Sequence, residues 1–381
     1  MMKGRDLFTV LILAAAIAAV SVALVVTMPS GTTDMGPSDT VSPAVPETEP
    51  EAESSQYPEG ISFDQNTGVL SSDESVTWYI VDELTESENK VRWTYVGNSV
   101  TFDPGLYTVT VGNETFNVIM GGVHTNTVSW NYWFKGTSYD VSVTYDIDLS
   151  ELAELTLENR EQNRYMSKSF SNLPSLVYVN DTVCSIVAQL EKRFVEIGGD
   201  LSDRQSYADF LVSFAQLGIK YPNWVDGSSD KQVWGIDEYW AKSLETLFFM
   251  KGDCEDSAAA ACSLFKAAGY RTAMIGVSGH VTAAVSLEEF TEVDMTEVSS
   301  HNLLYKTFTL AKGTSAVADD PQDIVYYGVD TTKKQVPVGY MLNGSVNNIG
   351  KNTKWGTAGF YPVTSDRRRR YPFVVKRLRV R

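Results

Sequence analysis

One segment of this 381-residue chain constrains the fold most, because it places a cysteine where a loop turns into a helix. The segment is residues 251–270, KGDCEDSAAAACSLFKAAGY. Asp253 is a good N-cap, the alanine-rich stretch behind it has high helix propensity, and Gly269 supplies a left-handed stop. Cys254 therefore falls in the first helical turn, where the helix dipole favours a thiolate and the acidic neighbours oppose it.

A reactive cysteine needs a basic partner, and the chain offers three histidines. His280 lies between two apolar runs in residues 274–285, a pattern that predicts a strand, a tight turn and a returning strand that begins at the histidine. An imidazole on a strand beside the helix would be held rigidly. His124 and His301 have no motif around them, so His280 is the predicted base.

An aspartate could orient the imidazole, and Asp330 ends the β-rich run 324–332. About fifty residues separate His280 from Asp330, which predicts an inserted excursion over residues 288–322. Three alternatives lie in a loop-like run just upstream: Asp319, Asp320 and Asp323. Cysteine, histidine and aspartate at the ends of regular elements are typical of an acyl-transfer triad.

Four short stretches carry a resemblance to a known family. They are YWAKSLETL (239–247), GDCED (252–256), Gly279-His280 and GVDTT (328–332). Together they resemble the transglutaminase-like superfamily, in particular its prokaryotic cysteine protease or amidase branch, over residues 180–360. The resemblance implies an α+β fold with a papain-like, transglutaminase-like catalytic domain, and a triad of Cys254, His280 and Asp330.

An oxyanion hole requires donors near the developing negative charge, and the backbone N–H of Cys254 is the natural first donor. The resemblance suggests a second donor ahead of the helix, for which Trp240, Tyr239 and Gln216 are candidates. Core packing is the alternative role for the two aromatic residues. Asp253 and Asp256 are expected to support the cysteine from the same helical turn.

We predict no metal and no cofactor. A zinc site built from the triad residues is disfavoured, because no Cys-x-x-Cys or His-x-x-x-His spacing supports it. Calcium dependence occurs in some animal members of the family, but the acidic residues here lack the spacing of a calcium loop. Cys184 and Cys262 are predicted to be core residues.

The N-terminus predicts a membrane anchor. After Lys3 and Arg5, residues 7–27 are apolar and uncharged, long enough to cross a bilayer with the N-terminus in the cytoplasm. A cleaved signal peptide is the rival interpretation. Residues 29–60 contain six prolines, seven acids and no Lys or Arg, which is typical of an unfolded stalk. The folded part would then lie outside the cytoplasm.

The chain is expected to contain six parts. They are an anchor (1–28), a stalk (29–60), a small immunoglobulin-like β-sandwich (61–125), a hairpin with a connecting segment (126–179), the transglutaminase-like domain (180–363) and a basic tail (364–381). Hairpin turns are predicted at Gly112-Asn113 and Lys135-Gly136. Helices are predicted at 181–196 and 203–217 from caps and apolar spacing.

The charge is unevenly distributed. The net charge is −17, yet the last sixteen residues carry eight Lys or Arg against one Asp. This tail could bind acidic envelope polymers or lipid headgroups, or simply neutralise the acidic body. Nucleic acid is not an expected partner, because the acidic body would repel phosphate and no recognition motif is present.

These features predict a membrane-anchored, outward-facing cysteine hydrolase or acyl transferase that acts on peptide or amide bonds of a peptide or protein. A protein-crosslinking transglutaminase is one alternative. A surface binding module without turnover is the other, although the complete set of Cys254, His280 and Asp330 argues against it.

Overall fold

The computed structural model describes residues 56–165, 169–277, 279–291, 306–307, 309–310, 326–332, 335–341 and 359–363. The chain divides into units 1–54 and 55–381, and all described residues belong to the second. The predicted anchor, most of the predicted stalk, most of the predicted excursion over 288–322 and the basic tail lie outside the described residues. Within them, no helix is long and apolar enough to cross a membrane. They form a mixed α/β protein with several sheets.

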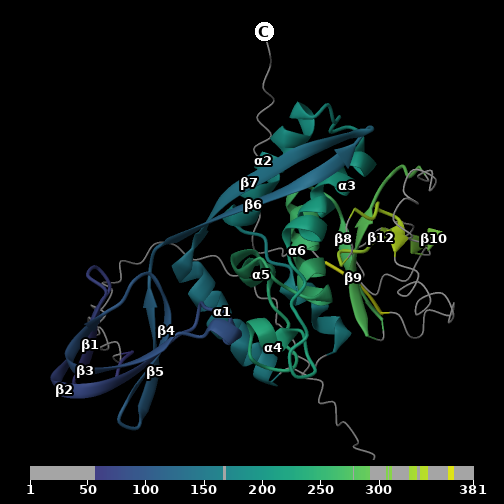
Figure 1. Ribbon diagram of the computed structural model, residues 1–381. Coiled ribbons are helices and arrows are strands. Elements are labelled where there is room, and N and C mark those ends of the chain that lie inside the picture. The colour runs from purple at the N-terminus through teal and green to yellow at the C-terminus, as the bar shows by residue number, and fades with distance from the viewer. Residues whose placement is uncertain are drawn as a thin grey trace, which may run out of the picture. The chain divides into compact units, whose positions relative to one another are not determined.

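The first sheet is antiparallel and has five strands (Figure 1). These are β1 (Ile61–Asp64), β2 (Val69–Asp82), β3 (Arg92–Thr101), β4 (Gly105–Val111) and β5 (Glu114–Met120). The order is β1-β2-β4-β5, and β3 also pairs with β2. Its core includes the fully buried Leu70, Trp78 and Val109. The hairpin predicted at Gly112 is present, with Val111 opposite Glu114.

A long hairpin covers the helical part of the molecule. β6 (Val123–Phe134) and β7 (Thr137–Asp148) turn at residues 135 and 136, as predicted. Alternate β6 side chains are buried, and Trp130 packs edge-on to Phe214 at 5.6 Å. The opposite face carries hydroxyl pairs such as Thr127 with Thr144. This alternation explains why one face enters the core while the other faces solvent.

Helices follow the hairpin. They are α1 (Leu149–Tyr165), the 3₁₀ turn η2 (Phe170–Leu176), α2 (Asp181–Glu196), α3 (Arg204–Ser213), the π-turn η3 (Phe214–Gly218), α4 (Asp230–Val233), α5 (Ser243–Phe249) and α6 (Cys254–Ala267). The predicted helix 181–196 is confirmed, and the predicted helix 203–217 corresponds to α3 plus η3. Cys184 is exposed on α2, so its predicted place in the core is wrong. The apolar face of α2 is formed by Val183, Ile186 and Leu190 instead.

The second five-stranded sheet lies beside α6 (Figure 1). Its order is β11 (Thr309–Leu310), β12 (Tyr326–Val329), β9 (His280–Ser286), β8 (Thr272–Val277) and β14 (Gly359–Pro362). A separate pair joins β10 (Lys306–Thr307) to β13 (Tyr340–Met341). Cys262 on α6 is fully buried, as predicted, and its Sγ lies 3.3 Å from the carbonyl oxygen of Ala273 on β8. The cysteine helix is therefore packed directly on the sheet.

Candidate functional site

Cys254 is the first residue of α6, as the sequence predicts. Asp253 occupies the N-cap position, but its carboxylate makes no capping bond and instead accepts a hydrogen bond from the Ser229 hydroxyl at 3.0 Å. Gly252 fits because a Cβ there would lie 2.5 Å from the Cβ of Asp256. The backbone before the cysteine therefore passes very close to the helix that follows it.

The helix start meets the start of β9. The backbone N–H of Val281 donates to the Sγ of Cys254 at 3.4 Å, and His280 is the residue immediately before it. β8 and β9 pair as the predicted antiparallel strands, with Val277 opposite His280. The structure thus brings the predicted nucleophile and the predicted base to neighbouring positions.

Asp330 follows the last residue of β12, where the sequence predicts it. β12 pairs antiparallel with β9, and the last register pair is Val329 with Ala283. Asp330 comes one residue after this pair, just beyond the end of β12. The pairing of β12 with β9 therefore brings the segment of Asp330 beside the first half of β9, the strand that begins at His280.

Asp330 is fully buried and held from two sides. Its Oδ1 accepts hydrogen bonds from the backbone N–H and the hydroxyl of Thr332, at 3.0 and 2.9 Å. Its carbonyl oxygen accepts from the Gln216 amide at 2.8 Å, and the same nitrogen donates to the Val336 carbonyl at 2.9 Å. Gln216 is therefore engaged in holding this loop.

The other two candidate oxyanion donors are also engaged elsewhere. The Trp240 indole N–H donates to Glu238 at 2.7 Å. The Tyr239 hydroxyl, buried with its ring, donates to Glu245 at 2.7 Å. These hydrogen bonds of Trp240, Tyr239 and Gln216 thus go to groups other than Cys254.

Tyr221 is a residue at this site that sequence reasoning missed. Its segment runs beside the cysteine loop, because the N–H of Gly252 donates to the carbonyl of Lys220 at 3.2 Å. Burial and the charges of Asp253, Cys254 and Glu255 raise the pKa of the Tyr221 phenol, while the residue stays 51% exposed. No motif surrounds Tyr221, and only the aromatic-rich stretch beginning at Trp224 hinted at this region.

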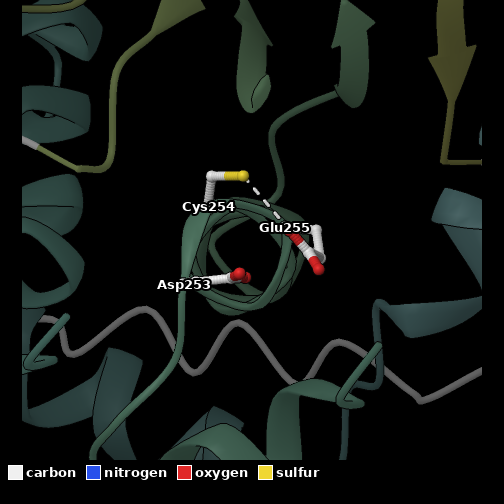
Figure 2. A group of neighbouring side chains, drawn as sticks. All are labelled: Asp253, Cys254 and Glu255. Carbon is white, nitrogen blue, oxygen red and sulfur yellow. Dashed lines mark hydrogen bonds between the residues drawn. The ribbon is translucent and has the colours of Figure 1, made fainter. Parts of the chain in front are cut away.

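Burial and the neighbouring acids disfavour the thiolate form of Cys254. Burial raises the pKa of Cys254 far above its ordinary value, Glu255 and Asp253 raise it further, and the Val281 N–H opposes them. The thiol donates to the Glu255 carboxylate at 3.2 Å (Figure 2). Burial, followed by the charge of Asp253, also raises the pKa values of Glu255 and Asp256. The first turn of α6 is thus a buried acidic environment, and the thiol would need a base to ionise.

The arrangement can support proton transfer and nucleophilic attack, with the thiol, an imidazole and a buried carboxylate in one region. Among the described residues, one close grouping of metal-binding side chains joins Cys254 to Asp253 and Glu255, and none of the groupings includes His280 or Asp330. The geometry therefore gives no support to a zinc site built from the triad.

Comparison of the chain with protein-family models, with curated proteins and with solved structures finds no match.

Proposed function

We propose that this chain is a cysteine hydrolase or acyl transferase with a transglutaminase-like catalytic domain, anchored in a membrane and facing away from the cytoplasm. The observation that carries the proposal is the hydrogen bond from Val281 to the Sγ of Cys254, which joins the helix start to the strand that begins at His280. The location rests on the apolar run at 7–27.

In the proposed reaction, His280 takes the thiol proton while Sγ attacks an amide carbonyl. The tetrahedral oxyanion forms near the backbone N–H of Cys254, one of the unpaired donors at the start of α6. The C–N bond then breaks, His280 returns its proton to the leaving amine, and a thioester remains on Cys254. Asp330 keeps the imidazole oriented.

Water or an amine resolves the thioester. Water, deprotonated by His280, gives a free carboxylic acid and completes hydrolysis. A lysine amine gives an isopeptide bond, which would make the protein a crosslinking transglutaminase. We favour hydrolysis on the family resemblance alone.

The test is site-resolved alkylation of the full-length chain in mild detergent by iodoacetamide at pH 7. The chain supplies its own reference, because Cys184 is exposed and Cys262 is fully buried. We expect Cys254 to react faster than Cys184 despite its lower exposure. His280→Ala should slow the reaction of Cys254 by about tenfold or more, the scale of general-base assistance, and leave Cys184 unchanged.

The proposal would be contradicted if Cys254 were alkylated more slowly than Cys184 and if His280→Ala left the rate of Cys254 unchanged. The non-catalytic binding module would then be the better explanation, because the buried acids would simply keep the thiol protonated.

A further inference from the structure

Three asparagines of the chain are followed two residues later by a serine or threonine. They are Asn113, Asn180 and Asn343. This Asn-x-Ser/Thr sequence accepts N-linked glycans in exported proteins when the asparagine lies at the surface. Asn343 lies outside the described residues, and the structure places the other two asparagines in opposite surroundings.

Asn113 lies at the tip of the hairpin formed by β4 and β5. Because Val111 stands opposite Glu114, the turn consists of Gly112 and Asn113 alone. Gly112 has a φ of +57°, and a Cβ built there would meet no atom within 4 Å. The turn is therefore surrounded by open space.

The hydroxyl that the acceptor sequence requires is also at the surface. It belongs to Thr115 on β5, which is exposed, as is Asn113. The Thr115 hydroxyl lies 2.9 Å from the hydroxyl of Thr110, its cross-strand neighbour on β4. A transfer enzyme could therefore reach both side chains of this acceptor sequence on the folded chain.

Asn180 is only 3% exposed, and both polar atoms of its amide are engaged. Its oxygen accepts from the Val183 N–H at 3.1 Å as the N-cap of α2, and its nitrogen donates to Glu151 at 2.8 Å. A sugar on this nitrogen would have to occupy the buried space around the cap. A chain modified at Asn180 could not keep this cap in place, so folded molecules should carry Asn180 unmodified.

We propose that Asn113 carries an N-linked glycan and that Asn180 carries none. The donor would be an oligosaccharide linked through phosphate to a membrane lipid. The Asn113 Nδ2 forms a bond to the first carbon of the sugar, the bond from that carbon to the phosphate oxygen breaks, and the lipid phosphate leaves with the electron pair. The amide gives up one proton. The proposal rests on the outward orientation in the proposed function, because this modification belongs to exported chains.

The position also suits a glycan because of where β5 lies in the sheet. Among the described strands, β5 pairs only with β4, so it forms an edge. Native sheets protect their edges from pairing with other chains. A bulky, hydrated glycan at the start of β5 would provide such protection.

The experiment is mass spectrometry of the full-length chain purified from its native host, both intact and after proteolysis into peptides that separate Asn113 from Asn180. We expect the Asn113 peptide to carry the mass of a glycan and the Asn180 peptide to have its unmodified mass. Thr115→Val, a change of similar shape at an exposed strand position, should remove the added mass from Asn113. Thr115→Ser is the matched control and should retain it, because serine also completes the acceptor sequence.

An unmodified Asn113, a glycan on Asn180, or an added mass that persists in Thr115→Val would overturn the proposal. Protease treatment of intact cells then shows whether the orientation failed as well. If the domains are digested from outside while Asn113 is unmodified, the glycan proposal alone is wrong. A glycan on Asn113 in a chain without histidine-assisted alkylation of Cys254 would refute the proposed catalysis alone.

Discussion

Gln216 shows how one buried side chain can hold a candidate catalytic loop. Its amide nitrogen donates to the carbonyls of Asp330 and Val336, residues on the same loop but six positions apart. The residue lies in the π-turn η3, an insertion that changes the direction of side chains relative to a regular helix. The sequence identified Gln216 as important but could not indicate which atoms it would contact.

We expect Gln216→Met to loosen this loop while filling a similar volume. Two buried carbonyls would each lose a donor, which should lower the free energy of unfolding by about 1–3 kcal/mol in chemical denaturation. Alkylation of Cys254 at pH 7 should slow in Gln216→Met to the same extent as it does in Asp330→Asn. Gln189→Met is the control, because Gln189 is only partly buried on α2 and its amide donates to the carbonyl of Thr144. An unchanged alkylation rate of Cys254 in Gln216→Met would show that Gln216 does not support the triad.

Tyr221 offers a sharper distinction, because its segment runs beside the cysteine loop, the charge of Cys254 contributes to the raised pKa of its phenol, and the residue is half exposed. If the hydroxyl stabilises an oxyanion, Tyr221→Phe should slow acylation of Cys254 by an activated ester such as p-nitrophenyl acetate on the order of 10²-fold. Alkylation by iodoacetamide forms no oxyanion and should not change. Tyr95→Phe, at an exposed position on β3, serves as the control. Equal slowing of both reactions would indicate a general disturbance of the site.

At the scale of elements, the helices and strands with a regular apolar pattern could be predicted from the sequence. The helix whose buried face includes polar residues could not. The periodicity of apolar residues and the cap at Asn180 located α2, and alternation located the β6–β7 hairpin. Helix α1 was missed within the connecting segment because its buried face includes polar residues. Asn159 is fully buried there, where it donates to the Trp240 carbonyl at 2.9 Å and to Glu245 at 2.6 Å. Partners 81 and 86 residues away have no local signature.

The same limit applies to the candidate site. Cys254, His280 and Asp330 were located by local motifs and strand ends, and the structure brings these elements together. The directions of the Trp240 and Tyr239 donors could not be predicted. Each depends on an acid, Glu238 or Glu245, whose position is fixed by packing.

The loop that joins β12 to β13 should respond to pH. Asp209 on α3 accepts from the Val338 N–H of this loop at 2.6 Å, and burial, with a contribution from Asp203, raises its pKa from 3.8 to about 7. Between pH 4 and 7 the folded chain would therefore bind a proton that the unfolded chain has released. The contribution of this group to stability consequently falls as the pH rises through that window.

We expect Asp209→Asn to remove this slope. The full effect in the wild type is at most on the order of 4 kcal/mol between pH 4 and 8, since one pKa unit corresponds to about 1.4 kcal/mol. Urea unfolding at several pH values measures it, with Asp140→Asn as an exposed control. Identical slopes for the wild type and Asp209→Asn would contradict the assignment to Asp209.

At the scale of the whole molecule, the first sheet region supports the cysteine loop. Lys251, three residues before Cys254, forms ion pairs with Glu86 and Glu88. Gln232 also donates to Glu88 at 3.0 Å, and Arg160 on α1 pairs with Glu83 at 3.0 Å. The region predicted as a separate module is thus connected to the candidate catalytic part by charged contacts.

Glu86→Gln should loosen this connection without removing an apolar contact. Hydrogen exchange in residues 220–253 should become faster, and the loss of stability should be modest, about 1 kcal/mol, because the pair is only partly buried. Glu196→Gln is the control, since Glu196 forms ion pairs within the exposed end of α2. Exchange that changes equally in both variants would mean that the Glu86 contact is not specific.

The exposed position of Cys184 has a consequence for where the chain can reside. A free surface thiol survives in a reducing compartment, but in oxidising surroundings it forms disulfides with other molecules or becomes capped. A chain that faces away from the cytoplasm should therefore carry Cys184 as a mixed disulfide, a covalent dimer or an oxidised sulfur when it is isolated with thiols blocked at lysis. A Cys184 recovered fully reduced from its native host would indicate a reducing environment and argue against export.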